Sequence, residues 1–98
     1  MDEMRSKLDH QWTIAELAKL AGMSSRSFLR RFESATSMTP AQWLLRQRLS
    51  EAKSLLETSD ISIEEIAATC GFGSATNMRH HFRKELKLTP SAYRQRFA

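Results

Sequence analysis

Apolar residues recur at helical spacing along nearly the whole chain, and short polar stretches separate the apolar segments. The longest segment runs from Pro40 to about Leu56 and contains no Gly and no further Pro. Its start carries the signals of a helix, because Thr39 suits the N-cap and Gln42 completes a capping box with it. This pattern predicts a helix about 25 Å long at the usual rise per residue. The apolar residues of its stripe are Trp43, Leu44, Leu49, Ala52, Leu55 and Leu56.

Shorter helical segments lie on both sides of this long helix. Thr13 and Glu16 form a capping box at the start of one segment, and a Gly follows its last apolar residue. Ser62 and Glu65 form the same box in another segment, which also ends at a Gly. Gly and Pro number only 3 and 2, and β-branched runs are absent, so we predict an all-α protein with about seven helices. They cover about 4–9, 13–21, 25–36, 40–56, 62–70, 74–86 and 90–97.

The chain before the long helix and the chain after it resemble two copies of one unit. Each copy consists of a helix, a short turn that contains Gly, and a second helix, which is the pattern of a helix-turn-helix. We therefore expect two helix-turn-helix subdomains, at about 8–38 and 58–98, joined by a linker helix at about 39–57. With one extra residue in the second turn, the matched pairs are Ile14/Ile63, Leu17/Ile66, Ala18/Ala67, Gly22/Gly71, Phe28/Met78, Phe32/Phe82, Thr39/Thr89, Pro40/Pro90 and Trp43/Tyr93.

Composition narrows the class of protein without fixing it. The chain has 98 residues, of which 41% are hydrophobic, so it should fold as one modest domain or as two very small subdomains that share a core. The net charge of +4 favours a polyanionic partner only weakly. The single Cys excludes an internal disulfide and fits a reducing compartment. Because we find neither an apolar run of membrane length nor a basic-then-apolar leader, we expect no membrane association and a cytoplasmic protein.

The position of the charges is more informative than their sum. Residues 25–32 and 74–84, within the second helix of each copy, contain no Asp or Glu. Three acidic residues, Glu16, Glu64 and Glu65, lie instead near the start of the first helices, where they favour the helix dipole. A helix-turn-helix places its second helix in the major groove of DNA, so this distribution indicates duplex binding. The basic residues are Arg26, Arg30 and Arg31 in the first copy and Arg79, His80, His81, Arg83 and Lys84 in the second.

Spacing assigns the faces of these second helices. Phe28 and Phe32 are expected to point into the core in the first copy. Met78 and Phe82 take their places in the second copy, and the opposite faces are left for DNA. Arg binds guanine with two hydrogen bonds, whereas small apolar groups contact the thymine methyl. The predicted base-reading residues are Ser25, Arg26, Leu29, Arg30, Ala75, Thr76, Arg79 and His80. The predicted phosphate-binding residues beside them are Ser24, Ser27, Arg31, Ser74, Asn77 and Arg83.

These segments carry a likeness to a known family. From about Gln11 to Phe97 the chain resembles the DNA-binding domain of AraC/XylS-type bacterial transcription regulators. The stretch that starts at Gln42 looks most like members that carry an amidotransferase-like sensor domain at their N-terminus. The likeness rests on IEEIAATCGFGS (63–74), FRK (82–84) and LTPSAYR (88–94), with Arg48, Leu49, Ala52, Leu55 and Leu56 in the linker.

The resemblance implies one AraC-type DNA-binding domain over 1–98, whose two recognition helices enter successive major grooves on one face of double-stranded DNA. It implies RNA polymerase as a further partner, and an N-terminal effector or dimerisation domain that this chain lacks, although some members stand alone. A location at the nucleoid follows. Ser37 and Lys87 stand where the family often has Gly, so either the helix ends there without a left-handed residue or these side chains tolerate one at a cost. The implied base readers are Arg26, Leu29, Arg30, Thr76, Arg79 and His80.

Catalysis has little support in the sequence. His80 and His81 diverge by about 100° on a helix, which is poor geometry for a shared metal. Cys70 lies on an apolar helical face, where a small hydrophobe fits better than a nucleophile. Paired carboxylates, a Gly-rich phosphate loop and metal-ligand spacing are absent from the sequence. We therefore expect no enzyme, no cofactor and no metal site.

Two alternatives to sequence-specific duplex binding stay open. The first is a helical protein-interaction module that binds a polymerase subunit or another regulator through the same basic helices. The second is a binder of RNA or single strands, for which Trp12, Trp43 and Tyr93 would form a stacking platform. These aromatic residues recur at helix starts that face the core, so we expect them to pack.

Overall fold

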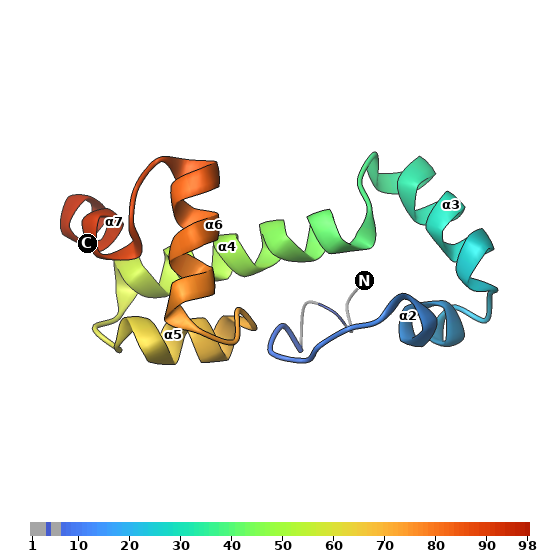
Figure 1. Ribbon diagram of the computed structural model, residues 1–98, viewed down its shortest axis with the longest axis horizontal. Coiled ribbons are helices and arrows are strands. Elements are labelled where there is room, and N and C mark those ends of the chain that lie inside the picture. The colour runs from blue at the N-terminus through green and yellow to red at the C-terminus, as the bar shows by residue number, and fades with distance from the viewer. Residues whose placement is uncertain (1–3, 5–6) are drawn as a thin grey trace.

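The computed structural model describes residues 4 and 7–98, and helices are the only regular secondary structure in that part of the chain (Figure 1). The prediction of an all-α protein is confirmed, with six helices among the described residues. Within the same residues, no helix combines the length and the apolar character needed to cross a membrane. The helices are α2 (Ile14–Leu20), α3 (Ser25–Thr36), α4 (Pro40–Thr58), α5 (Ile63–Cys70), α6 (Ala75–Leu86) and α7 (Pro90–Phe97).

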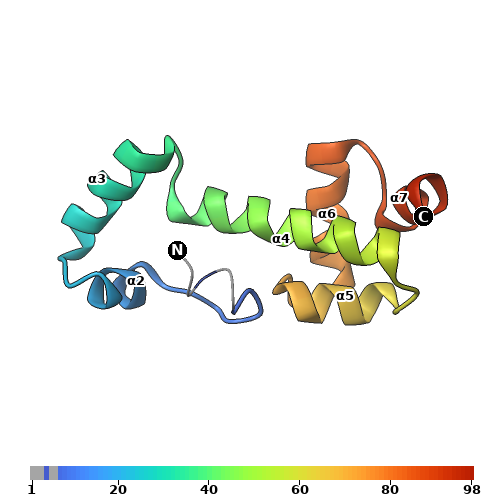
Figure 2. The ribbon, with the colours of Figure 1, turned by 180° about the vertical axis from the view of Figure 1, so that it is seen from behind.

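The molecule is elongated, with principal extents of 44 × 21 × 21 Å. The long helix α4 runs between the two ends, with α2 and α3 at one end and α5, α6 and α7 at the other (Figures 1 and 2). Among the described residues, α4 is the one helix that packs closely against both groups. The closely packed pairs are α2–α3, α3–α4, α4–α5, α4–α7, α5–α6 and α6–α7.

Hydrophobic residues form two buried clusters, and α4 contributes to both. Trp43 and Leu44, near the start of α4, belong to the cluster at the α2–α3 end. Leu49, Ala52 and Leu56 belong to the cluster at the other end. The first core consists of Met4, Leu17, Phe32, Trp43 and Leu44. The second core consists of Leu49, Ala52, Leu56, Ile66, Ala67, Cys70, Phe72, Met78, Phe82 and Tyr93.

Side-chain caps define the helix starts. Both predicted capping boxes at Thr13 and Thr39 are complete, with bonds in each direction. At Ser62 the hydroxyl oxygen accepts a hydrogen bond from the Glu65 amide at 3.1 Å, but the structure gives no return bond from the carboxylate. The prediction of a third full capping box is therefore wrong, because the exposed Glu65 carboxylate stays with solvent.

The long helix continues past its predicted end near Leu56 and stops at Thr58. Thr58 Oγ1 donates to the Ser54 carbonyl at 2.7 Å. Ser59 Oγ donates to the Leu55 carbonyl, also at 2.7 Å. These hydroxyl groups satisfy carbonyls of the last turn that would otherwise lack partners, which supports the helix beyond its predicted end.

The short first helix, predicted at about 4–9, falls partly on residues 5 and 6, which lie outside the described residues. Met4 is buried in the first core, with 2% of its surface exposed. Residues 7–10 form a turn in which the His10 amide donates to the Lys7 carbonyl at 3.1 Å. Within the described part of this segment, Met4 is helical, whereas residues 7–10 form a turn that continues into an extended stretch before α2 (Figure 1).

Two helices end on residues that carry side chains in the left-handed region. The C-cap of α3 is Ser37 with φ of 59°, and the C-cap of α6 is Lys87 with φ of 61°. The open question at these positions is thereby resolved in favour of a left-handed residue. Such a conformation brings Cβ close to the following carbonyl and costs about 1–2 kcal/mol, which Gly avoids.

We expect Ser37→Gly to raise the free energy of unfolding by about 0.5–1 kcal/mol, because relief of backbone strain exceeds the added entropy of the unfolded chain. Urea denaturation measures the change. Ser34→Gly, at an exposed position inside the same helix, is the matched control and should lower the stability by about 0.5–1 kcal/mol. Equal losses in both variants would show that Ser37 carries no strain.

Candidate nucleic-acid interface

The predicted base-reading residues of the first unit share one exposed face of α3. On the opposite side, Phe32 is 6% exposed and packs edge-on against Trp43, with ring centroids 6.2 Å apart. This contact fixes the rotation of α3 about its axis, so Arg26 and Arg30 face solvent. The outer face of α3 consists of Ser25, Arg26, Leu29 and Arg30, all of them exposed.

The second unit repeats this arrangement on α6. Phe82 is fully buried and packs edge-on against Tyr93, with ring centroids 6.0 Å apart. Met78, the counterpart of Phe28, is also fully buried, whereas Phe28 is half-buried. The outer face of α6 consists of the half-buried Ala75 and the exposed Thr76, Arg79 and His80.

The arginines of both outer faces have no ionic partner among the residues that the structure describes. Within the described residues, the one ion pair joins His10 to Glu16 and lies outside both faces. Arg26, Arg30 and Arg79 therefore keep all their donors, and the planar guanidinium group suits bidentate binding to guanine or phosphate. A shallow hollow on α6, without any acidic residue, is lined by Thr76, Arg79, His80, Arg83 and Lys84.

Several of the predicted phosphate-binding residues also stabilise the helix starts. Ser24 Oγ accepts from the Ser27 amide at 3.2 Å and donates to Ser27 Oγ at 3.0 Å. In the second unit, Ser74 Oγ accepts from the Asn77 amide at 3.1 Å. The Asn77 side chain donates to the Phe72 carbonyl at 3.0 Å. These side chains therefore have part of their hydrogen-bonding capacity in use before any ligand binds.

Arg31 and Arg83 complete the set of phosphate candidates. Both are exposed, and neither guanidinium group makes a hydrogen bond or an ion pair with the described part of the chain. They lie beside the outer faces of α3 and α6, on the same helices. Free guanidinium groups at these places can attract phosphates without specifying a base sequence.

The two adjacent histidines have different surroundings. His80 is exposed on the outer face of α6, whereas His81 is half-buried, and its Nδ1 atom is buried without a hydrogen-bond partner. Burial lowers the pKa of His81, and the nearby His80 and Lys84 lower it further. His81 therefore stays neutral at the edge of the core, where its ring lies 6.1 Å from that of Phe72. Among the described residues, no cluster of His, Cys, Asp or Glu could hold a metal ion.

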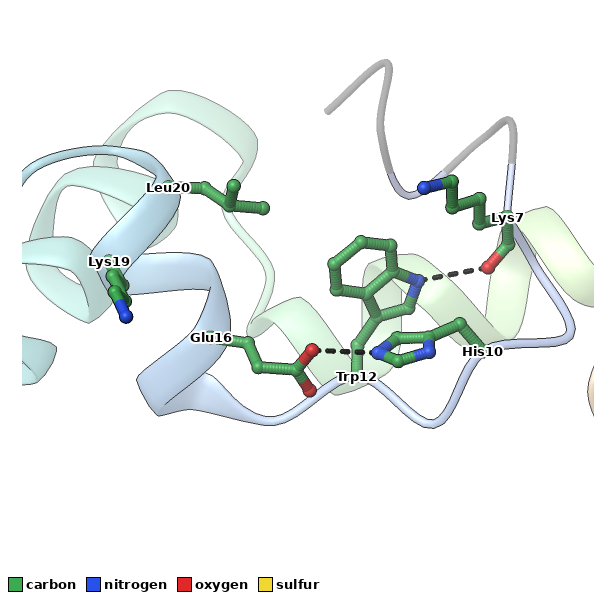
Figure 3. Close-up of a pocket in the computed structure, with 6 residues that line it drawn as sticks. All are labelled: Lys7, His10, Trp12, Glu16, Lys19 and Leu20. Carbon is green, nitrogen blue, oxygen red and sulfur yellow. Dashed lines mark hydrogen bonds and ion pairs between the residues drawn. The ribbon is translucent and has the colours of Figure 1, made fainter.

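A second surface hollow lies beside α2, away from both outer faces (Figure 3). Trp12 forms one wall, and its indole N–H donates to the Lys7 carbonyl at 3.0 Å. His10 Nε2 lies 2.7 Å from a carboxylate oxygen of Glu16, and this bond lowers the pKa of Glu16. Because Trp12 also packs against the first core and Trp43 and Tyr93 are buried, these aromatic residues do not form a shared stacking platform.

Two arginines outside both outer faces bind main-chain carbonyls, and sequence reasoning missed them. Arg48 Nε donates to the Leu8 carbonyl at 3.1 Å. Arg94 holds the end of α4 by donating to the carbonyls of Leu56 and Ser59, at 3.3 and 3.1 Å. Every residue type supplies a carbonyl, so no residue pattern marks such partners in advance.

Cys70 is fully buried in the second core. Burial raises the pKa of its thiol to about 11, and the Glu51 carboxylate adds to this rise. The thiolate, which is the reactive form, is therefore scarce at neutral pH. The environment of Cys70 is that of a small hydrophobic residue.

We expect iodoacetamide at pH 8 to modify native Cys70 at least about a hundredfold more slowly than the chain unfolded in urea, because an ordinary thiol has a pKa near 8.5. Mass spectrometry of timed samples measures the rate. In the Cys70→Ala background, Ser50→Cys places the thiol at an exposed position of α4 and should react at the ordinary rate. Rapid modification of native Cys70 would contradict the buried environment.

The sequence matches known regulators over most of its length. A family model described as "Helix-turn-helix domain" matches residues 17–96. The HTH-type transcriptional regulator Rv1931c of Mycobacterium tuberculosis is 39% identical over 85 residues, covering 87% of this chain and 33% of the relative. The HTH-type transcriptional activator RhaS of Klebsiella pneumoniae is 38% identical over 80 residues, covering 82% and 29%. The chain thus spans about a third of the length of these relatives.

The fold also matches solved structures. The DNA-binding domain of AdpA, described as a global transcriptional factor in complex with a target DNA, has a TM-score of 0.93 and 45% identity, covering 98% of this chain and 86% of that chain. An AraC-type transcriptional regulator from Chromobacterium violaceum has a TM-score of 0.88 and 27% identity, covering 99% and 87%.

Proposed function

Because the chain belongs to the AraC/XylS-type family of helix-turn-helix domains of bacterial transcription regulators, we propose that it binds double-stranded DNA sequence-specifically through α3 and α6. In this proposal, residues 1–98 act as one DNA-binding domain, with helix-turn-helix subdomains at about 8–38 and 58–98 and a linker helix at about 39–57. The proposed activity is that of the DNA-binding part of a transcription regulator.

The observation that carries the proposal is the repetition of one exposed, acid-free helix face in both units of an elongated molecule. The two faces belong to opposite ends of a molecule 44 Å long. Major-groove segments one helical turn apart on one side of a duplex are separated by about 34–36 Å. The length of the molecule is therefore sufficient for α3 and α6 to enter successive grooves. The AdpA relative was solved in complex with a target DNA, which agrees with this class of partner.

Binding would begin with long-range attraction and end with contacts to bases. The basic side chains and the helix starts approach the phosphates and release counterions, which contributes affinity for any sequence. The outer faces then select a sequence, since each good bidentate contact discriminates by about 1–3 kcal/mol. The proposed phosphate contacts are Ser24, Ser27, Arg31, Ser74, Asn77 and Arg83.

The side chains of the outer faces divide by chemistry. Arg26, Arg30 and Arg79 are proposed to bind guanine through their paired donors. The methyl groups of Leu29, Ala75 and Thr76 are suited to contact with the thymine methyl. Leu29 is a large apolar side chain with 38% of its surface exposed, so such a contact would remove apolar surface from water. Ser25 and His80 supply single hydrogen bonds to a base or a nearby phosphate.

Further partners belong to the same proposal. Relatives named transcriptional activators support RNA polymerase as a second partner of the DNA-bound domain. Effector binding and dimerisation are proposed to belong to the part of those relatives that this chain does not match. Duplex binding in a bacterium would locate the protein at the nucleoid in the cytoplasm.

Selection from random duplex DNA, followed by measurement of affinity across salt concentrations, tests the proposed function. We expect a preferred motif in two parts, and an affinity for it that falls steeply with salt. A chain that prefers unpaired strands, or that selects no motif, would overturn the proposal.

We expect Arg30→Ala to lower the affinity for the selected motif by about 1–3 kcal/mol and to relax the choice at one base position. The loss of a bidentate contact causes both effects. A repeated selection with the variant measures them. Arg96→Ala, which removes an exposed arginine of α7 outside both outer faces, is the control and should leave the motif unchanged. An unchanged motif with Arg30→Ala would rule out base reading by this side chain.

We expect Arg83→Ala to weaken binding to all duplex sequences by a similar factor. Loss of one phosphate contact should reduce the steepness of log affinity against log salt by about 0.9. Fluorescence anisotropy with the selected duplex and with a scrambled duplex, at four or more salt concentrations, measures both quantities. Arg96→Ala again serves as the control. If the slope stays the same while the preferred motif changes, Arg83 reads a base and not a phosphate.

A further inference from the structure

We propose that Arg48 is a positioning residue that sets which spacing between the two parts of a DNA site the domain accepts. The proposal rests on the proposed function, because spacing has meaning only if both outer faces bind one duplex. It concerns the segment 7–12, named here the N-terminal strap, which runs beneath the N-terminal half of α4 (Figures 1 and 2). Arg48 lies on α4 between the residues of the first core and those of the second.

Arg48 binds the N-terminal strap with two parts of its guanidinium group. Nε donates to the Leu8 carbonyl at 3.1 Å, and Nη2 donates to the His10 carbonyl at 3.0 Å. The side chain is half-buried, and burial lowers its pKa, but the guanidinium group stays protonated. A planar fork with fixed donors suits two carbonyls at once, which the single ammonium group of Lys does not.

The N-terminal strap also contacts the second unit, at Gly71, which is the C-cap of α5. Gln11 Nε2 donates to the Gly71 carbonyl at 3.5 Å. A Cβ atom at Gly71 would overlap the Leu8 carbonyl and lie 2.6 Å from Arg48 Nε. The main chain of the N-terminal strap therefore lies directly against the turn that leads into α6, with Arg48 beside it.

At its other side the strap is joined to the first unit. His10 Nε2 lies 2.7 Å from a Glu16 carboxylate oxygen on α2 (Figure 3). The Trp12 indole N–H donates to the Lys7 carbonyl, which joins the two ends of the strap (Figure 3). Leu8 and Trp12 also pack against the first core. The strap thus connects α2 to the end of α5 independently of the course of α4.

The helix α4 and the N-terminal strap together restrain the relative orientation of the two units more than α4 would alone. Among the closely packed helix pairs in the described part of the chain, α4 is the one link between α2–α3 and α5–α6–α7. A single helix that joins two small cores can bend or twist, whereas a second link beside it resists both. Insertion of one base pair moves a half-site by about 3.4 Å and turns it by about 34° around the duplex. A rigid pair of outer faces cannot follow that displacement, and a loosened pair can.

The experiment compares duplexes in which the two parts of the selected motif are separated by the best spacing, by one base pair more and by one base pair fewer. We expect the wild-type chain to lose about tenfold or more in affinity for either shifted duplex, comparable to one mismatched base pair. In Arg48→Ala this ratio should shrink to about threefold or less, while the bases preferred within each part stay the same. Arg48→Lys should restore the spacing preference only partly, because it replaces a fork by one donor group.

Glycine variants provide an independent test with a matched control. Gly71 is the C-cap of α5 with φ of 89°, and Gly22 follows the C-cap of α2 with φ of 68°, so Ala strains the backbone at both positions. A Cβ atom at Gly22 would meet nothing within 4 Å, whereas at Gly71 it displaces the strap. We expect Gly71→Ala to relax the spacing preference and Gly22→Ala to retain it, with thermal melting followed by circular dichroism to establish that each variant is folded at the assay temperature.

The outcomes separate the two proposals. If the wild-type chain selects no duplex motif, the proposed function fails. If it selects one, and Arg48→Ala lowers affinity for all three spacings by the same factor, then Arg48 only stabilises the fold and this inference is overturned. Spacing preferences that relax equally in Gly71→Ala and Gly22→Ala would also overturn it, because backbone strain and not the strap contact would be responsible.

Discussion

One amphipathic helix supplies buried side chains to both hydrophobic cores of this protein, and that sharing is the constraint on which the architecture depends. Trp43 and Leu44 complete the first core, and Leu49, Ala52 and Leu56 complete the second. Segments of about 40 residues rarely bury enough surface to fold alone. Each half completes its hydrophobic core with side chains of α4. Folding of the two halves therefore also fixes their separation along a molecule 44 Å long.

The repeat uses one packing device twice. In each unit an aromatic residue of the second helix packs edge-on against an aromatic residue of the following helix, Phe32 on Trp43 and Phe82 on Tyr93. These contacts take one face of α3 and one face of α6 into the cores. The opposite faces then project arginines that have no ionic partner in the described part of the chain. Uncompensated charge of this kind adds nothing to folding stability, and its presence at matching places points to a ligand that carries the opposite charge.

Local rules predicted much of this from the amino-acid order. Helical periodicity and the box at Thr39 located α4, and the matched apolar positions revealed the repeat. The spacing of Phe32 and Phe82 correctly predicted which helix faces are exposed. Local rules failed where alternatives were close in energy. The helix α4 continues past its predicted end near Leu56 to Thr58, where the hydroxyl groups of Thr58 and Ser59 bind carbonyls of the last turn. Ser37 accepts a left-handed conformation that the sequence alone left undecided.

The sequence by itself determined the helices, their buried faces and the candidate reading residues, because these follow from the period of a helix and from side-chain chemistry within a few positions. Only the tertiary structure decided how the two units are held relative to each other. Arg48, Arg94 and Gln11 bind main-chain carbonyls that are distant in sequence. Gly71 is needed for the close approach of a strap that lies far from it along the chain. Every residue has a main-chain carbonyl, so contacts of this kind can be identified only in the folded chain.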